Sequence, residues 1–304
     1  MQLKKKLKDF FNVKAHAKLQ ADRVIFSVRA DLLNMKINGC LDRGVSDERY
    51  CDHELIVSLT TFGKRLYSVA TTIESIMQGT LKPNKIILWL DEKLKGQYLP
   101  RNLMKQMERG LTIEYCKDIR SYTKLIPCLK KYPQAIIVTV DDDILYDQDM
   151  LEKLFVAHKE SPDMIIANRV HQIVLDSSSR PVSYKSWRWK QTLDDESFLN
   201  FLTGVGGVLY PPHCLDEEVF NENVFLDICK YADDVWFYAM ALKKGTIVKK
   251  AYTRDKYGED YVMNPTVQDV GLCLLNVNDS VCRNDIQIKA VFEKYALYDK
   301  LKNN

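Results

Sequence analysis

The sequence predicts an α/β fold in which helices flank a mostly parallel β-sheet. From residue 54 onward, short apolar runs typical of buried strands alternate with longer segments of helical periodicity. Three acidic residues stand together directly after one of these runs, in AIIVTVDDDIL (135–145). Ligand sites of parallel sheets lie at the carboxyl ends of the strands, so this acidic turn is the first candidate for a functional site.

Local patterns predict each element of this domain in order. Five apolar runs are predicted strands: ELIVSLTTF (54–62), KIILWLDE (85–92), LTIEYC (111–116), AIIVTV (135–140) and DMIIANRV (163–170). Three segments are predicted helices: RLYSVATTIESIMQG (65–79), TKLIPCLKKYP (123–133) and DMLEKLFVAHKE (149–160). Right-handed crossovers through the helices would make the sheet parallel.

The first 48 residues are expected to form a helical extension, and residues 49–304 a single domain. MQLKKKLKDFFNVK (1–14) carries five lysines and has apolar residues at helical spacing, and a second helical stretch is expected over 21–35, ending near Gly39. Two interpretations of this basic helix stay open. It either lies on an anionic inner membrane surface or packs on its own domain with solvated lysines.

Composition excludes several classes of protein. The net charge of +3 is too small to indicate a nucleic-acid-binding protein. No apolar stretch approaches the roughly 20 residues of a membrane-spanning helix, and no secretory signal is visible. The eight cysteines are scattered without a CxxC pair, as expected for free thiols in a reducing compartment. We therefore expect a cytoplasmic protein, either free or peripheral at the inner face of the plasma membrane.

The acidic turn has the chemistry of a metal site. Because side chains alternate along a strand, Asp141 and Asp143 are expected on one side and Asp142 on the other. Two converging carboxylates suit Mg²⁺ or Mn²⁺, which substrate phosphates usually complete. The ordinary alternative is a solvated acidic turn.

One enzymatic interpretation of this turn is a phosphatase of the haloacid dehalogenase type. Asp141 would be the nucleophile and Asp143 the acid/base, while Thr203, Lys230 and the Asp233–Asp234 pair would supply the later motifs. That family begins its core at the nucleophile strand, whereas several β/α units precede Asp141 here.

A resemblance accounts for more of the chain. The segments IVSLTTFGKRL (56–66), KIILWLDE, the acidic turn, GVGGVLYPP (204–212) and ADDVWFYAMALKKG (232–245) resemble bacterial glycosyltransferases of the GT-A fold, closest to family 2-like enzymes of surface-polysaccharide assembly. The resemblance implies a Rossmann-like nucleotide-diphosphate-sugar fold, a nucleotide-sugar donor and a glycan or lipid-linked acceptor. A catalytically inactive polysaccharide-assembly subunit is the non-enzymatic alternative.

The resemblance also implies roles for individual residues. Asp141 would face the ribose, Asp142 would lie in the donor site, and Asp143 would hold the metal together with Asp141. The remaining implied donor contacts are Ser58, Leu59, Thr60 and Thr61 in the first loop, Asp91 at the base, and Gly206 and Gly207 beside the donor sugar.

Sugar transfer explains why such groups are needed. Breaking the bond between the anomeric carbon and phosphate leaves negative charge on the diphosphate, which a divalent cation would neutralise. Arg65 and Lys124 are candidate further phosphate partners. The acceptor hydroxyl must lose a proton to a base on the opposite side of the sugar, which implies an inverting reaction. The resemblance places that base at Asp234, with Asp233 as the other member of the pair; helix capping is the ordinary alternative.

Three further features complete the sequence-based expectations. Tyr184, Trp187 and Trp189 in SYKSWRWKQ (183–191) are candidate acceptor contacts because aromatic faces stack on sugars, and core packing is the alternative. Asn284 and Asp285 could close over the donor or cap a helix. No histidine follows His213, so the further histidine ligand of many metal-dependent members is lacking.

Overall fold

The computed structural model describes residues 2–192, 196–267 and 282–302, with side chains from residue 17 onward. Eight strands form the central sheet in the order β3-β2-β1-β4-β10-β6-β11-β8. Their bounds are β1 Leu55–Thr60, β2 Lys85–Asp91, β3 Leu111–Cys116, β4 Ile136–Thr139, β6 Ile165–Ala167, β8 Glu196–Ser197, β10 Val208–Tyr210 and β11 Val248–Lys250.

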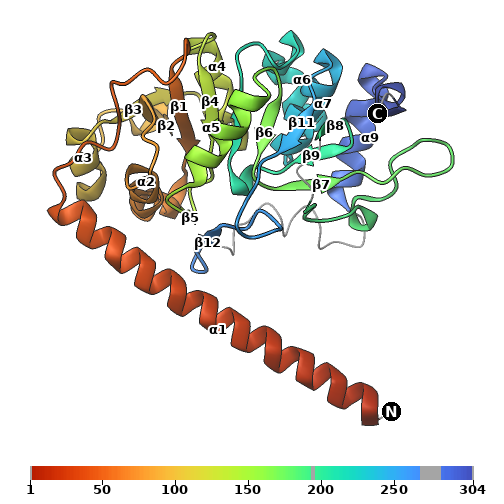
Figure 1. Cartoon of the computed structure of the whole chain (residues 1–304), viewed down its shortest axis with the longest axis horizontal. Helices are drawn as coiled ribbons and strands as arrows, with labels where there is room; N and C mark the ends of the chain where they lie inside the picture. Colours follow the sequence, from red (N-terminus) through yellow and green to blue (C-terminus); the bar gives the residue numbers. More distant parts are fainter. Residues whose placement is uncertain (1, 193–195, 268–281, 303–304) are drawn as a thin grey trace.

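The sheet is mostly parallel. Strands β3, β2, β1 and β4 run parallel to one another, and so do β6 and β11. Strand β10 runs antiparallel between β4 and β6, and β8 pairs antiparallel with β11. Helices cover the sheet (Figure 1). The predicted α/β class, a mostly parallel sheet flanked by helices, is confirmed.

Both faces of the sheet are buried. Ile56 and Ile137 belong to the hydrophobic cluster on one face, and their chain neighbours Val57 and Val138 belong to the cluster on the other. Because each strand is buried on both sides, it reads in the sequence as a continuous apolar run rather than as an alternating one.

The helices divide between these two clusters. Helices α2 Val69–Met77, α3 Arg101–Glu108 and α5 Met150–Glu160 contribute to one cluster; α4 Ile126–Lys131, α6 Glu222–Ile228, α7 Asp233–Lys244 and α9 Arg283–Tyr295 contribute to the other. Pro127 lies in the first turn of α4, where its missing N–H has no partner in the helix anyway. Gly245 ends α7 with a φ of 91°, a left-handed conformation that favours glycine.

Two small sheets and several short 3₁₀ helices complete the domain. β5 Ile144–Tyr146 pairs with β12 Tyr261–Met263, and β7 Val170–Gln172 pairs with β9 Asn200–Leu202. The expected single strand over 163–170 is therefore wrong, because the chain leaves the central sheet after β6 and enters a second sheet at β7. The 3₁₀ helices are η1 Gly63–Tyr67, η2 Glu92–Leu94, η3 Arg120–Lys124, η4 Tyr184–Ser186, η5 Gly204–Gly206, η6 Glu217–Phe220 and η8 Tyr298–Lys302.

The N-terminal extension is one helix, α1 Gln2–Gly39, rather than the two helical stretches expected. It runs along one side of the domain and its N-terminal part extends beyond the domain (Figure 1). Near its C-terminal end Ile37 is buried. Arg29 donates to a carboxylate oxygen of Asp147 over 2.9 Å and to the Tyr146 carbonyl over 3.0 Å. This half of α1 therefore packs on its own domain. Among the described residues, we find no helix that combines the length and the apolar character needed to cross a membrane.

Candidate functional site

The acidic turn lies where β4 leaves the centre of the sheet. Strand β4 ends at Thr139, so Asp141, Asp142 and Asp143 lie in a turn and not in the strand itself. The alternation of side chains along a strand consequently does not govern them, and the expected grouping of Asp141 with Asp143 is wrong. Asp142 and Asp143 share one partner, Arg65, while Asp141 has another, Lys124.

The first group of contacts, which we call the Arg65 cluster, comprises Thr61, Arg65, Asp142 and Asp143. Arg65 Nη1 lies 2.7 Å from Asp142 Oδ1, and Nη2 lies 3.1 Å from Asp143 Oδ2. The Thr61 hydroxyl donates to the other oxygen of Asp142 over 2.6 Å. All four residues are buried. Burial raises the pKa of Asp142, and Arg65 and Thr61 counter part of that rise.

The second group, the Lys124 cluster, comprises Lys124, Asp141, Asp233 and Asp234. Lys124 Nζ lies 2.8 Å from Asp141 Oδ1 and 3.0 Å from Asp233 Oδ2, so it bridges the acidic turn to the start of α7. Burial by itself would lower the pKa of Lys124, but the carboxylates of Asp141, Asp233 and Asp234 outweigh it and hold that pKa well above its usual value. The lysine is therefore charged at neutral pH.

Asp234 differs from the other carboxylates in its surroundings. Both of its oxygens accept from the backbone N–H of Gly204 over 3.2 Å. Although part of the residue remains exposed, the surrounding protein withdraws its carboxyl from bulk water. This burial, together with the neighbouring Asp233, raises the pKa of Asp234 to about 7. A carboxylate with that pKa can exchange a proton near neutral pH.

Helix capping does not explain the acidic pair. The residue at the cap position of α7 is Ala232, which has no side-chain hydrogen bond to the helix. The carboxylate of Asp233 is directed to Lys124, and that of Asp234 to Gly204. Neither aspartate therefore serves as an ordinary helix cap.

Gly204 belongs to this site, and the sequence analysis missed it. A Cβ at this position would stand 2.8 Å from Lys124 Nζ, 3.2 Å from Asp234 Oδ1 and 3.6 Å from Asp141 Oδ1. The absence of a side chain thus lets three charged groups converge. The row of three glycines over 204–207 pointed to this segment but did not indicate which glycine faces the carboxylates.

Gly206 and Gly207 face other parts of the protein. A Cβ at Gly206 would stand 3.1 Å from the Arg169 Cβ, and one at Gly207 would stand 3.1 Å from Met150 Sδ. Gly207 also has a φ of 90°. The close approach that these glycines permit is therefore to neighbouring protein atoms, and their expected contact with a donor sugar gains no support.

Tyr146 is a second residue that the sequence analysis missed. Its buried hydroxyl accepts from the backbone N–H of Asp141 over 3.0 Å and donates to the Val205 carbonyl over 3.1 Å. It thereby fixes the acidic turn against the segment that carries Gly204. The available signal was a tyrosine ending the apolar run ILY, five residues after Asp141.

The expected nucleotide-binding loop lies partly in the interior. The buried Ser58 hydroxyl donates to the Lys124 carbonyl over 2.6 Å and accepts from Trp89 Nε1 over 2.9 Å. The side chain of Leu59 is fully buried in the core. These two side chains therefore hold the end of β1 in place instead of facing a ligand.

Thr60 and Asp91 lie at the same carboxyl edge of the sheet. The Thr60 hydroxyl donates to the Trp89 carbonyl over 3.0 Å. Asp91 ends β2 and caps η2, where its side chain accepts from the backbone N–H of Lys93 over 3.0 Å. Asp91 remains partly exposed, at the strand end where it was expected.

The candidate acceptor aromatics belong mostly to the core. Tyr184 and Trp187 are buried against Phe201, which favours the packing alternative for both. Trp189 is 38% exposed and stacks on His171 with ring centroids 4.9 Å apart. Burial, helped by the nearby Arg169 charge, lowers the pKa of His171 to about 3, so this ring is neutral.

Helix α9 is bonded to the segment that carries these aromatic residues. Asp285 in α9 accepts from the Ser183 hydroxyl over 2.7 Å and from the Tyr184 backbone N–H over 2.6 Å. Asn284 is buried. The residue at the cap position of α9 is Cys282, so neither side chain occupies that position.

The arrangement does not present a ready metal site. Each of the three aspartates of the acidic turn is already in an ion pair with Arg65 or Lys124. Within the ranges that the structure describes, no three histidine, cysteine, aspartate or glutamate side chains are placed to hold one ion. A divalent cation at Asp143 would have to share that carboxylate with Arg65, so the residues as arranged do not fit the expected ion.

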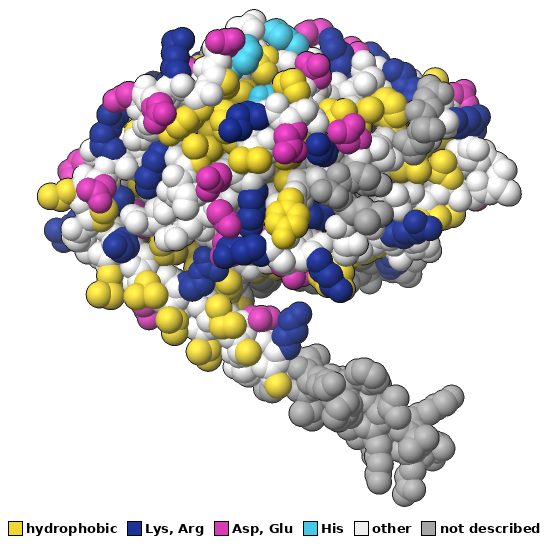
Figure 2. All heavy atoms as spheres, viewed as in Figure 1, with side chains coloured by type: hydrophobic (Ala, Val, Ile, Leu, Met, Phe, Trp, Pro, Cys, Tyr) yellow, Lys and Arg dark blue, Asp and Glu magenta, His cyan; other side chains and the backbone are white. Residues whose placement is uncertain are grey.

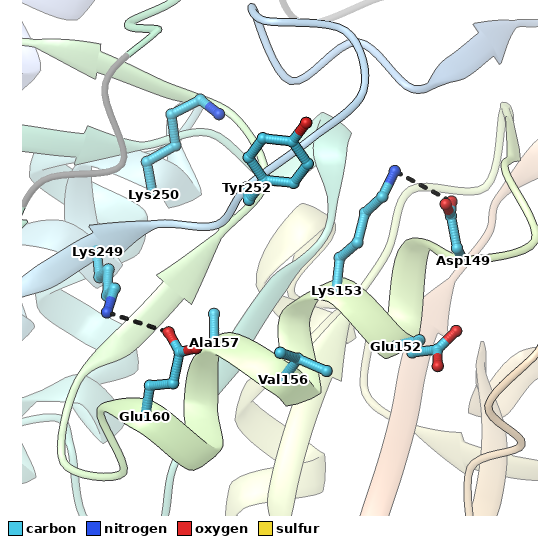
Figure 3. A pocket seen from close by; sticks show the side chains of 9 residues that line it. All are labelled: Asp149, Glu152, Lys153, Val156, Ala157, Glu160, Lys249, Lys250 and Tyr252. Carbon is cyan, nitrogen blue, oxygen red and sulfur yellow. Dashed lines mark ion pairs between the residues drawn. The ribbon is translucent and has the colours of Figure 1, made fainter.

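A separate cavity of about 330 Å³ lies beside α5 and β11 (Figure 3). Four of its charged lining residues form two ion pairs: Lys249 with Glu160 and Lys153 with Asp149. None of the residues of the Arg65 or Lys124 cluster lines this cavity. It is therefore distinct from the candidate site.

Comparison with known proteins finds similar solved structures but does not assign the chain to a family. No family model matches the sequence, and no curated protein matches it. The mannosyltransferase PcManGT from Pyrobaculum calidifontis, solved with GDP-Man and Mn²⁺, is 13% identical with a TM-score of 0.47 and covers 95% of this chain and 79% of its own. A CMP:2-keto-3-deoxy-manno-octonic acid synthetase complexed with CTP is 11% identical with a TM-score of 0.36 and covers 66% of this chain and 89% of its own.

Proposed function

We propose that this protein is a glycosyltransferase that moves a sugar from a nucleotide-diphosphate sugar to a glycan or glycolipid acceptor. The observation that carries the proposal is the convergence of Lys124, Asp141, Asp233 and Asp234 around Gly204. This cluster lies at the carboxyl edge of the parallel strands, where α/β proteins bind their ligands. Its three aspartates come from two of the motifs that resemble GT-A enzymes.

Asp234 is the proposed catalytic base. Its pKa near 7 and its partial exposure suit a group that takes a proton from an acceptor hydroxyl. The acceptor oxygen then forms a bond to the anomeric carbon while the bond from that carbon to the diphosphate oxygen breaks. The bonding electron pair leaves with the diphosphate, and the configuration at the anomeric carbon inverts.

Asp233 and Lys124 have supporting roles in this proposal. Lys124 is charged and buried between Asp141 and Asp233, so it holds the acidic turn against α7. Arg65 has the corresponding position beside Asp142 and Asp143. Since both cations are engaged with aspartates, we assign them to fixing the site rather than to direct phosphate binding.

Use of Mn²⁺ or Mg²⁺ is a separate part of the proposal. The ion pairs of the acidic turn with Arg65 and Lys124 argue against it, because these cations already occupy the carboxylates. Calorimetric titration with Mn²⁺, with and without UDP or GDP, tests it in the wild-type chain and in Asp143→Asn. Metal use predicts uptake that needs both the diphosphate and Asp143. Equal nucleotide binding in EDTA and in Mn²⁺ would show that donor binding needs no metal.

The phosphatase alternative fits the contacts less well. Lys230 was a candidate for one of its later motifs, but Lys230 lies over the Tyr231 ring, and the lysine that contacts Asp141 is Lys124. The Thr203 hydroxyl donates to the Arg169 carbonyl and is engaged within the protein.

A panel of donors separates the three functional hypotheses. Release of nucleoside diphosphate from a UDP-, GDP- or other nucleotide-sugar, abolished in Asp234→Asn, is the expected result. Release of phosphate from phosphosugars would support the phosphatase instead. Absence of any nucleotide-sugar binding in calorimetry would support an inactive subunit. With a lipid-linked glycan as acceptor, product formation would test the surface-polysaccharide role that we propose from the resemblance.

A further inference from the structure

One face of α1 is apolar and exposed. Ile25, Val28, Leu32 and Met35 recur at spacings of three and four, and each is between 48% and 70% exposed. We call these four residues the outward stripe. Figure 2 shows hydrophobic side chains along this side of the helix. Soluble proteins rarely leave an unbroken apolar row of this kind in water, so it calls for a partner.

A neighbouring face of the same helix attaches it to the domain. Phe26 and Leu33 are half-buried and Ile37 is buried, again at helical spacing. Arg29 anchors this side through its two bonds to the β5 end, at Asp147 and the Tyr146 carbonyl. Leu32 and Met35 also line a cavity between α1 and the domain, but each is more than half exposed. The outward stripe therefore lies beside the attached face and remains open to solvent.

The charge of the helix identifies the kind of surface it suits. Residues 1–39 contain nine lysines and arginines against three aspartates, a net charge of +6, whereas the whole chain carries +3, so the remaining 265 residues carry −3. An apolar face with a strongly basic polar composition is typical of helices that lie in the headgroup region of anionic membranes.

A second copy of this chain fits the stripe less well. The row Ile25, Val28, Leu32 and Met35 matches two heptads of a coiled-coil seam, but of the two preceding seam positions Ala21 is small and Lys18 is charged. Stable seams usually extend over three or four heptads. We propose that α1 lies on an anionic lipid surface, with the outward stripe buried at the boundary between headgroups and acyl chains.

This attachment would bring the candidate site close to the lipid. Arg29 binds the Tyr146 carbonyl, and the Tyr146 hydroxyl binds the backbone N–H of Asp141, so one residue separates α1 from the acidic turn. An acceptor anchored in the same membrane would reach the site without leaving it. The lipid contact itself does not depend on the proposed transferase activity.

Vesicle co-sedimentation of the full chain tests the proposal. We expect binding to vesicles that contain phosphatidylglycerol, weak binding to pure phosphatidylcholine, and release at high salt. The double variant Ile25→Ser/Leu32→Ser should lower the partition coefficient by about tenfold or more, because it removes apolar side chains that would enter the bilayer. The matched control is Val156→Ser/Ile286→Ser, which changes two exposed apolar residues outside α1 and should leave binding unchanged.

Two outcomes would overturn the proposal. One is equal vesicle binding by the stripe variant and the wild type. The other is a stable dimer in sedimentation equilibrium that Ile25→Ser/Leu32→Ser dissociates, with no vesicle binding by the wild type; the stripe would then be an interface between copies. Circular dichroism of each variant confirms that a loss of binding is not a loss of folding.

Discussion

The Arg65 cluster and the Lys124 cluster each include aspartates of the same acidic turn, yet the surroundings of these aspartates differ. In the Arg65 cluster, one cation serves two carboxylates, and Asp142 is bonded on both oxygens. In the Lys124 cluster, one cation stands among three carboxylates, and Asp234 has only a backbone N–H as its hydrogen-bond partner in the described contacts. The second cluster therefore carries more uncompensated negative charge.

This difference separates structural from chemical roles. A buried carboxylate with strong partners on both oxygens is held in one charge state, because removing its charge would leave the partners unpaired. A carboxylate that is buried and also lies beside like charges, as Asp234 does, has a raised pKa and can gain or lose a proton near neutral pH. We therefore expect changes in the Arg65 cluster to affect stability most and changes at Asp234 to affect the chemical step most.

The largest expected effect is that of Asp234→Asn. Loss of a general base should lower kcat by a factor of about 10² to 10⁴. The amide keeps the shape of the side chain, so donor affinity measured by calorimetry should stay near that of the wild type. Asp227→Asn, an exposed aspartate in α6, is the matched control and should retain full activity.

Full activity in Asp234→Asn would place the base elsewhere and remove the proposed distinction between the clusters. A fall in donor affinity equal to the fall in kcat would instead make Asp234 a binding residue.

The next largest effect is expected from Arg65→Met. Removing the cation leaves Asp142 and Asp143 buried without their charge partner, which should lower the free energy of unfolding by about 3–5 kcal/mol. Urea unfolding measures this loss. Adding Asp142→Asn should restore part of it, because the double variant has one buried charge fewer. Additive losses in the double variant would show that the two residues do not stabilise the fold as a pair.

The sequence was sufficient to predict the parallel sheet and the position of the acidic turn. Strands such as Leu55–Thr60 and Ile136–Thr139 are buried on both faces and therefore appear as plain apolar runs. It did not predict that the chain changes sheets between Ala167 and Val170, because the two polar residues between them, Asn168 and Arg169, were included in a single expected strand.

The partners within the site could not be predicted from local patterns. Arg65 and Asp142 are 77 positions apart in the chain, and Gly204 and Asp234 are 30 apart. Such contacts depend on how β1, β4 and α7 pack, which neither periodicity nor motif spacing encodes. The motifs located both acidic groups, while the packing decided which aspartate meets which cation.

Two glycine substitutions, with smaller expected effects, compare Gly204 beside the carboxylates with Gly206 in the same segment. In Gly204→Ala the new methyl would stand 2.8 Å from Lys124 Nζ and 3.2 Å from Asp234 Oδ1, so it should displace the charged groups and lower kcat by about tenfold or more. In Gly206→Ala the methyl would instead press on Arg169, 3.1 Å from its Cβ. That variant should lose about 1–3 kcal/mol of stability and keep most of its activity.

Equal activity losses in the two variants would mean that the segment acts as a whole and that Gly204 has no special position beside the carboxylates.

The smallest expected effect is a pH dependence that belongs to the Lys124 cluster alone. With the pKa of Asp234 near 7, kcat/KM should rise about tenfold between pH 6 and pH 8, as the carboxyl loses its proton and becomes a base. Stability should change in the opposite sense: a carboxyl whose pKa is higher in the folded state than in the unfolded state favours folding at low pH, and this contribution disappears as the pH rises through 7. Chemical unfolding of the wild type and Asp234→Asn across this range measures the difference. If the two stability curves stay parallel from pH 5 to pH 8, Asp234 does not titrate there, and the contrast between the two clusters has another cause.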